Sequence, residues 1–469
     1  MKSLVWLRND IRFDDNPALQ KAFINSKIVH VIYIYSPIQN LKHFQSHHKT
    51  NLLIESLQEL AKRLKKLNVN VSVFKSDGFE HDPEIIEAFF KQHSFDKLFF
   101  NNLFGQDEKI RDKKLLDIFI KKSFDYETFD DQTLFSPGHI KTKENKPYSV
   151  FTPFKRKWLE YFDFELLNIE FNYESKISSN IEGNIENFDF NLKKIKTSYD
   201  WQAGEIAAKK LLNEFLKKKS SNYAKDRNDP ILEGTSRISP YLSIGVLSPK
   251  RCILEALKEN KMEIFSGNKG ILKWIDEIVW REFYRNIMFS FPKVSKGQPF
   301  QEYSKAIKWR YDEFEYNAWK KGMTGFPIVD AAMRQLLAEG WMHNRLRMVV
   351  AMFFTKNMLH DWRLGEGYFM QNLIDGDFSS NNGGWQWSSS TGTDAAPYFR
   401  IFNPITQSTN FDKNGKFIKK YIPELRDLDK SVIHNPPKEH RKYCNYPEPI
   451  LDLKESRLRA IEAFKTAKS

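Results

Sequence analysis

Short apolar runs alternate with segments of helical periodicity through the first 135 residues, and this alternation constrains the fold more than any other feature. The runs that predict strands are 3–7, 28–35, 69–73 and 97–100. The first helix is expected to begin near Asn16-Pro17, with Asn as its cap and Pro in its first turn. Strands that alternate with helices form a parallel sheet with helices on both faces. The sequence therefore predicts a doubly wound, Rossmann-like α/β domain over residues 1–135.

The rest of the chain divides by composition. Residues 136–200 are irregular, with Pro137-Gly138 and a polar run at 178–184, so they are predicted to be a linker. From Trp201 onward the periodicity is helical, and nine of the 11 tryptophans lie there, which predicts an all-α domain over 201–469. No phosphate-binding glycine fingerprint follows the first strand, so ordinary dinucleotide binding is not expected in the α/β domain.

Charge and cysteine content narrow the class of protein. A formal charge of +13 and a pI near 9.2 favour a polyanionic partner. Cys252 and Cys444 are too few and too far apart for a disulfide framework or a zinc site, and no metal site is expected. The sequence has neither a cleavable signal pattern nor an apolar run of membrane-spanning length. We therefore expect a soluble cytoplasmic protein without a membrane partner.

The segment 375–404 is rich in Gly, Ser and Asn, and its composition is typical of a flexible loop. It nevertheless carries Trp385, Trp387 and Tyr398, which is too much aromatic surface to leave in water. The segment is either the wall of a pocket for a planar ligand with polar edges or a connector whose tryptophans fill a core. Its composition does not decide between the two.

Two further stretches combine polar and aromatic side chains. On a helix, Trp274, Glu277, Trp280 and Arg281 share one face, and a face of that mixture suits a pocket better than a core. The hydroxyls at 235–239 stand at a predicted helix start, where they are either simple caps or a phosphate site. A capping role is the simpler interpretation for them, and a core role is the simpler one for His343.

Four motifs in order resemble the DNA photolyase/cryptochrome family, and most closely its bacterial class I cyclobutane pyrimidine dimer photolyases. They are Glu-Gly-Thr-Ser-Arg (233–237), Trp-Arg-Glu-Phe-Tyr (280–284), Gly-Trp-Met-His-Asn-Arg-Leu-Arg-Met (340–348) and Asn-Asn-Gly-Gly-Trp-Gln-Trp (381–387). The resemblance runs from Val5 to the last helix. It implies a monomeric enzyme that binds UV-damaged DNA and uses light to split pyrimidine dimers, with FAD held in the α-helical domain.

The resemblance also assigns residues to the cofactor. Tyr223 and the 235–239 segment would hold the pyrophosphate and ribitol of FAD, and Arg347 would pair with Asp375 near the flavin. Asn381 matches the position that faces flavin N5, where an amide tolerates the reduced anionic flavin that repair needs. The residues expected to bind FAD are Tyr223, Thr235, Ser236, Arg237, Ile238, Ser239, Trp274, Arg281, Asn344, Arg347, Asp375, Gly376, Asp377 and Asn381.

A second implied set binds the damaged DNA. Trp280 and Trp387 would be flat walls for a flipped-out dimer, and Glu277, buried and partly protonated, would stabilise the dimer radical anion that one electron from reduced FAD creates. Asn344 and Met348, where the branch that repairs (6-4) photoproducts has His, indicate cyclobutane dimers. The expected DNA-binding residues are Arg227, Glu277, Trp280, Asn344, Arg345, Met348, Trp387 and Arg400.

Electron supply and light harvesting complete the implied machinery. Trp385, Trp362 and Trp309 match the family's relay from the surface to oxidised flavin, although any one of them could be a core residue instead. Asp107, Glu108 and Lys296 lie at the positions that bind the antenna methenyltetrahydrofolate in folate-using relatives, although Asp107 replaces an Asn and Ser295 replaces a Cys of that site. This folate is favoured over a deazaflavin or an empty site. The alternatives on the same fold are a blue-light photoreceptor cryptochrome and a relative specific for single-stranded DNA.

Overall fold

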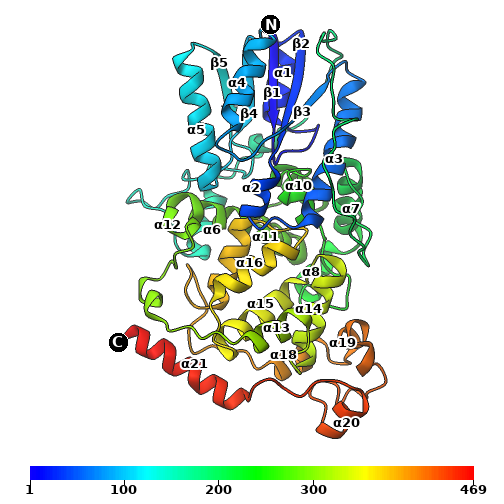
Figure 1. Ribbon diagram of the computed structural model, residues 1–469, viewed down its shortest axis with the longest axis vertical. Helices are drawn as coiled ribbons and strands as arrows, with labels where there is room; N and C mark the ends of the chain where they lie inside the picture. The colour runs from blue at the N-terminus through cyan, green and yellow to red at the C-terminus, as the bar shows by residue number, and fades with distance from the viewer. The chain divides into compact units, whose positions relative to one another are not determined.

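The computed structural model describes residues 1–469, which form two compact units (Figure 1). The α/β unit contains residues 1–195, 201–221 and 236–295, and the helical unit contains 196–200, 222–235 and 296–469. The chain therefore passes between the two units several times. The predicted division into an α/β domain (1–135), a linker (136–200) and an all-α domain (201–469) stays a prediction.

A five-stranded parallel sheet forms the centre of the α/β unit, as predicted. Its strands are β1 (Lys2–Leu7), β2 (Ile28–Tyr35), β3 (Val71–Lys75), β4 (Lys97–Asn101) and β5 (Asp125–Phe129), in the order β3-β2-β1-β4-β5. The edge strand β5 escaped prediction because its residues are partly or fully exposed and it lacks an apolar run. Helix α1 (Pro17–Asn25) begins as expected, since Asn16 accepts a hydrogen bond from the Leu19 amide at 3.2 Å.

Helices cover both faces of the sheet because its inner strands are buried and apolar along nearly their whole length. Leu4 and Trp6 of β1 join one buried cluster with Phe90 of α4 (Asp82–Gln92) and Phe119 of α5 (Gln106–Lys121). Helix α1 packs against β1, β4 and β5. The remaining helices of this unit are α2 (Pro37–Lys42), α3 (His47–Lys65), α6 (Phe151–Tyr161), η1 (Phe164–Leu167), α7 (Glu205–Lys218), α9 (Ser239–Ser243), α10 (Pro249–Glu259), α11 (Lys269–Ser290) and α12 (Pro292–Ser295).

An internal ion pair lies where such sheets usually bind ligands. Strand order reverses between β1 and β4, and ligands of doubly wound folds bind beyond the carboxyl ends of the strands at that point. Here Arg8, which follows β1, donates to both carboxylate oxygens of Asp112 at 2.8 and 2.9 Å and to the backbone carbonyl of Asn101. All three residues are buried. The crevice therefore holds an internal ion pair.

Residues 136–200 were expected to be irregular, but they include the helix α6. Phe151, Phe154 and Trp158 are buried along one face of this helix, which packs against α11. Phe154 and Phe283 have ring centroids 5.3 Å apart. The helical spacing of these three aromatic residues was present in the sequence, but neighbouring Pro and polar residues obscured it.

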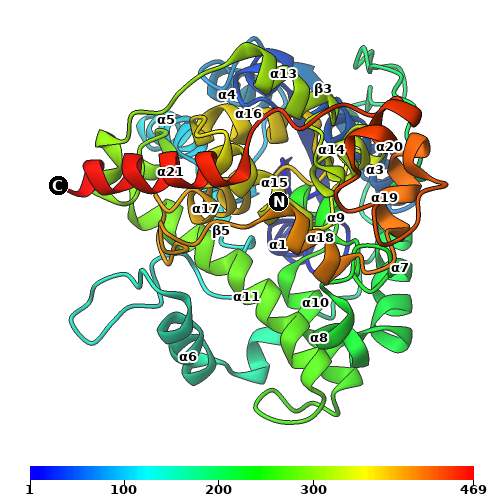
Figure 2. The same ribbon diagram turned by 90° about the horizontal axis from the view of Figure 1, so that it is seen from below.

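The helical unit surrounds one core that includes Trp319, Trp362 and Trp385. Its helices are η2 (Ser220–Asn222, shared with the α/β unit), α8 (Tyr223–Asp226), η3 (Glu302–Ala306), α13 (Glu313–Lys321), α14 (Pro327–Glu339), α15 (Asn344–Met352), the π-helix η4 (Phe353–Asn357), α16 (Trp362–Asn372), α17 (Phe378–Ser388), α18 (Pro404–Phe411), α19 (Lys416–Tyr421), η5 (Pro423–Leu425), α20 (Lys438–Tyr443) and α21 (Leu453–Lys468). Helix α21, red in Figure 2, packs against η3 and η4. None of the helices combines the length and the apolar character that crossing a membrane requires.

The loop predicted from the composition of 375–404 is in part a helix. Asp377 caps α17 by accepting a hydrogen bond from the Ser380 amide at 3.0 Å. Trp385 of α17 lies against Gly365 of α16, where any side chain would overlap the indole ring. Tertiary packing therefore overrides the low helix propensity of Gly383-Gly384.

Candidate functional site

In the α/β unit, the predicted polar and aromatic face of α11 is present. Trp274, Glu277, Trp280 and Arg281 all lie on this one helix, which spans Lys269–Ser290. Trp274 is buried and packs on Phe215 with ring centroids 5.5 Å apart. The other three are partly exposed, so this face carries side chains that can reach a ligand.

The hydroxyl-rich segment lies against this face of α11. The indole N–H of Trp274 donates to Ser236 Oγ at 3.2 Å. Arg281 donates to the backbone carbonyls of Gln132 at 2.6 Å and Leu242 at 3.2 Å. Ser239 is the first residue of the short helix α9. Hydroxyls, helix-start amides and a guanidinium thus gather within one unit, and this donor set suits a phosphate group.

The remaining residues of that segment differ in burial. Ile238 is buried, whereas Arg237 is partly exposed and has φ of 52°. The left-handed backbone at a non-glycine residue is uncommon. Thr235 is partly exposed and belongs to the helical unit.

The expectation that Glu277 is buried is wrong. Its side chain is 29% exposed, and its carboxylate lies 3.9 Å from the ammonium group of Lys273, one helical turn earlier. Spacing of i, i+4 brings the two side chains together on α11. The burial inferred from two neighbouring tryptophans did not account for this cation.

Trp280 has an aromatic partner that the sequence did not reveal. The ring of Phe151, the first residue of α6, stacks on Trp280 with a centroid separation of 3.7 Å and an angle of 8°. Phe151 itself is buried, and its ring also meets Phe283 edge-on at 5.9 Å. Phe151 therefore supports one face of the indole and fixes the plane in which Trp280 is presented. Only recognition of α6 as a helix could have suggested this pairing.

In the helical unit, His343 positions the first turn of α15. His343 is buried, and its Nδ1 accepts a hydrogen bond from the Arg345 amide at 3.2 Å, so it is the N-cap. The structural role preferred for this histidine is thereby confirmed. Asn344, the first residue of α15, is exposed, and Met348 is packed in part against the core.

Three arginines expected to contact DNA lie near enough in this unit for two of them to affect the pKa of the third. Arg345 donates to Asn228 Oδ1 at 2.7 Å and lies over the Phe411 ring at 4.5 Å. Burial lowers the pKa of Arg345, and the positive charges of Arg227 and Arg400 lower it further. These three cations on one unit are a suitable binding site for a polyanion.

Arg347 and Asp375 form the ion pair that the resemblance implied. The guanidinium Nη2 donates to both carboxylate oxygens of Asp375, at 3.0 and 2.8 Å, and Nε donates to the Met342 carbonyl at 2.9 Å. The Asp375 side chain is 4% exposed and that of Arg347 is 25% exposed. A pair with one partly exposed cation can offer both charges to a polar ligand.

Asn381 is oriented by a partner that sequence reasoning missed. Its amide nitrogen donates to the backbone carbonyl of Glu366 at 3.0 Å, which leaves the amide oxygen to accept from another group. The Glu366 side chain accepts from Asn382 Nδ2 at 2.8 Å, and burial raises the pKa of Glu366 to about 7. Nothing in the local sequence around Glu366 marked it as a partner of α17.

Gly376 and Tyr223, two further residues expected to bind FAD, are buried, and Arg227 lies 5.4 Å from the Tyr223 ring.

The predicted relay tryptophans share one core. Trp385 and Trp362 are buried in it and Trp309 packs against it, so all three belong to the helical unit. Trp387 is partly buried against the same core. The spacing between the rings of Trp385, Trp362 and Trp309 stays a prediction.

The antenna residues fall in two places. Asp107 and Glu108 are in the first turn of α5 in the α/β unit, and Lys296 is exposed in the helical unit. Asp107 Oδ2 lies 2.9 Å from His43 Nε2 and 3.1 Å from Gln39 Nε2. Asp107 therefore has two polar partners within its own unit.

Comparison with known proteins points in one direction. The sequence model described as "DNA photolyase" matches residues 3–171, and the one described as "FAD binding domain of DNA photolyase" matches residues 274–466. The chain is 39% identical over 472 residues to a deoxyribodipyrimidine photo-lyase of Escherichia coli, an alignment that covers 99% of this chain and 98% of that protein.

Solved structures with the same fold extend the comparison. A bacterial class III photolyase from Agrobacterium tumefaciens superposes with a TM-score of 0.89 at 32% identity, covering 100% of this chain and 98% of that one. An archaeal photolyase from Sulfolobus tokodaii, crystallised with two FAD molecules, superposes with a TM-score of 0.81 at 27% identity, covering 99% of this chain and 100% of that one.

Proposed function

Because the chain belongs to the DNA photolyase family, we propose that it is a deoxyribodipyrimidine photo-lyase, an enzyme that uses light to split pyrimidine dimers in damaged DNA. The observation that carries this proposal is the likeness to the Escherichia coli photo-lyase, which extends over 98% of that protein. Asn344 and Met348 support cyclobutane dimers as the substrate within this class.

The residues present fit FAD, which the family match implies. In the α/β unit, Ser236, Ser239 and Arg281 supply donors that suit the pyrophosphate. In the helical unit, the Arg347–Asp375 pair supplies a cation and an anion that suit the polar edge of a flavin. We propose that FAD binds through Tyr223, Thr235 and the other residues expected from the resemblance. The chemistry that reduced FAD supplies when bound is light-driven transfer of one electron to the dimer and its later return.

Asn381 favours a reduced cofactor. Because its amide nitrogen is engaged by the Glu366 carbonyl, its amide oxygen is the atom presented to a ligand. A reduced flavin carries an N–H at N5 and an oxidised flavin does not, so an acceptor at this position stabilises the reduced form. This orientation agrees with the proposed active state, the reduced anionic flavin.

The damaged DNA is held by residues of three kinds. Photolyases are a known example of enzymes that take the target bases out of the duplex stack. Trp280, held flat by Phe151, and Trp387 provide apolar faces for the extruded pyrimidines. Glu277 and Asn344 can hydrogen-bond the polar edges of the dimer. Arg227, Arg345 and Arg400 neutralise the phosphates that flank it.

Glu277 also acts on the reacting dimer. When Glu277 carries a proton, it can donate a hydrogen bond to a pyrimidine carbonyl on which negative charge develops. Its side chain is 29% exposed in this structure, so its carboxyl group can reach a bound dimer.

The electron supply and the antenna are part of the same proposal. We propose that Trp385, Trp362 and Trp309 return oxidised flavin to its reduced state by passing electrons inward. Methenyltetrahydrofolate is the proposed antenna, with Asp107, Glu108 and Lys296 at its site. The enzyme is proposed to act as a monomer on DNA inside the cell.

The direct test uses purified protein with its flavin photoreduced. The protein is mixed with duplex DNA that contains one thymine dimer, and samples are kept dark or illuminated with blue light. We expect loss of the dimer and recovery of intact thymines in the illuminated sample only. Retention of the dimer under light, with flavin bound and reduced, would refute the proposal and favour a photoreceptor role on the same fold.

A further inference from the structure

The core of the helical unit contains a second line of oxidisable rings. It starts at Trp385, the residue it shares with the proposed relay, and does not include Trp362 or Trp309. The ring of Trp385 meets that of Trp319 with a centroid separation of 6.1 Å and an angle of 72°. Trp319 lies on α13, and Tyr316, one turn earlier, stacks on it at 6.5 Å and 15°. Tyr311 follows at 6.0 Å from Tyr316. Each step joins neighbouring rings.

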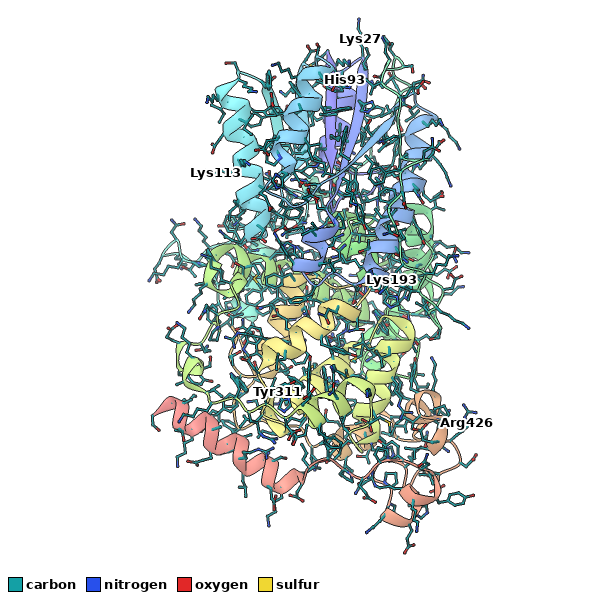
Figure 3. All side chains as sticks on the ribbon, in the orientation of Figure 1. Lys27, His93, Lys113, Lys193, Tyr311 and Arg426 are labelled. Carbon is teal, nitrogen blue, oxygen red and sulfur yellow. The ribbon has the colours of Figure 1, made fainter.

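The line ends at the surface. Trp385 and Trp319 are 2% and 0% exposed, Tyr316 is partly exposed, and Tyr311 is 61% exposed. Figure 3 labels Tyr311 beside α13. The exposure thus increases from the first ring to the last, as a path between a buried cofactor site and solvent requires.

The hydrogen bonding of the rings favours transfer along the line. The indole N–H groups of Trp385 and Trp319 are buried and have no acceptor among the protein atoms. A tryptophan that loses an electron in such surroundings keeps its proton, so its positive charge stays free to move to the next ring. A tyrosine loses its proton on oxidation, and the exposed Tyr311 can release that proton to water. The charge is therefore mobile on the indoles. The partly exposed Tyr316 gives its proton to water when it is oxidised and takes a proton back when Tyr311 reduces it, and the charge ends at Tyr311, the most exposed phenol of the line.

We propose that Trp319, Tyr316 and Tyr311 form a second electron path to Trp385, which ends in a neutral tyrosyl radical at the protein surface. The inference rests on the proposed function, in which light takes an electron from Trp385. One electron then moves inward along the three rings and restores Trp385. The O–H bond of Tyr311 breaks, and its proton goes to water. A soluble thiol restores the phenol by giving up a hydrogen atom and is itself oxidised.

Substitution of the tyrosines tests this path without disturbing the core. Tyr311→Phe and Tyr316→Phe keep the rings and remove the group that can be oxidised and deprotonated. Tyr443→Phe is the matched control, because Tyr443 is 89% exposed and lies on α20, apart from this line. The readout is electron paramagnetic resonance of the flavin-containing oxidised protein, recorded after a light flash and without a thiol.

We expect a tyrosyl radical in the unmodified protein and in Tyr443→Phe, and its loss in the double variant Tyr311→Phe/Tyr316→Phe. In a Trp362→Phe background, in which the proposed relay is cut, photoreduction should persist and should disappear when both tyrosines are replaced. The absence of a tyrosyl radical in the unmodified protein, or its survival in the double variant, overturns the proposal.

The outcome is separable from that of the proposed function. Chemical reduction of the flavin makes both electron paths unnecessary, so the double variant should then repair dimers as well as the unmodified protein. A protein that shows the radical but never repairs a dimer contradicts the photo-lyase assignment and leaves the electron path intact.

Discussion

Replacement of Phe151 by Leu tests whether the stack on Trp280 serves damage recognition. Leu keeps apolar volume at a buried position and removes the flat surface that lies 3.7 Å from the indole centroid. An aromatic pair contributes about 0.5–1.5 kcal/mol beyond the area that it buries. Without this support, Trp280 must be ordered when the dimer binds, and that cost appears as lost affinity.

The loss of affinity that Phe151→Leu can cause has an upper limit. Stability lost equally by the free and the bound protein cancels, so the loss of affinity cannot exceed the stacking energy. At tenfold per 1.4 kcal/mol, the dissociation constant for dimer-containing duplex should rise by about two- to twelvefold. The affinity for undamaged duplex should not change, because the dimer is the part of the DNA proposed to contact Trp280.

The assay is fluorescence anisotropy with labelled duplexes that differ only in the presence of one dimer. Phe162→Leu is the matched control, since Phe162 stacks on Trp158 at 5.6 Å and does so at the far end of α6. An unchanged affinity for the damaged duplex in Phe151→Leu refutes the reasoning. An equal loss on both duplexes, or an equal loss in Phe162→Leu, refutes it as well.

Four further changes test other parts of the site. Arg345→Ala should weaken binding to damaged and undamaged DNA alike and reduce the salt slope by about 0.9, measured by titration at several salt concentrations; a loss confined to dimer DNA contradicts a phosphate contact. Arg347→Met removes the ion-pair partner of a carboxylate that is 4% exposed, so the free energy of unfolding should fall by about 1–3 kcal/mol after allowance for the partly exposed cation. The flavin content of the purified protein should fall as well, and unchanged melting with full flavin contradicts this. Glu277→Gln should keep dimer binding and lower the repair yield per absorbed photon, and an unchanged yield excludes the proposed role. Burial lowers the pKa of Lys356 from 10.5 to about 7, so between those pH values the folded protein binds fewer protons than the unfolded chain and its stability rises with pH. Lys356→Met should remove that rise, measured by urea unfolding at pH 7 and pH 10, and an identical pH dependence in the variant contradicts it.

The fold was predictable where the pattern was local. Asn16 and Pro17 start α1 through a cap and a fixed φ, and both effects depend on neighbours in the sequence. The edge strand β5 and helix α17 were not predictable in this way. Strand β5 lacks an apolar run, and α17 is a helix because Asp377 caps it and Trp385 packs against Gly365.

The candidate site shows the same limit. The Arg347–Asp375 pair followed from the resemblance, because Arg347 lies in one of the matched motifs and Asp375 lies six residues before another. The stack of Phe151 on Trp280 and the bond from Asn381 to the Glu366 carbonyl join segments that the sequence treats separately. Lys273 lies near the Glu277 carboxylate because the two residues are one turn apart on α11, a spacing that is present in the sequence. Partners distant in the sequence therefore decided the surroundings of Trp280 and Asn381, whereas the partner of Glu277 is a local one.

The ion pair beyond β1 and β4 has a consequence for control of the enzyme. A doubly wound domain usually senses small molecules through that crevice, and entry of a nucleotide there would have to displace Arg8 from Asp112 and from the Asn101 carbonyl. Separation of a buried guanidinium from its carboxylate is costly. Binding of a nucleotide at this point of the sheet therefore carries the additional cost of breaking a buried ion pair.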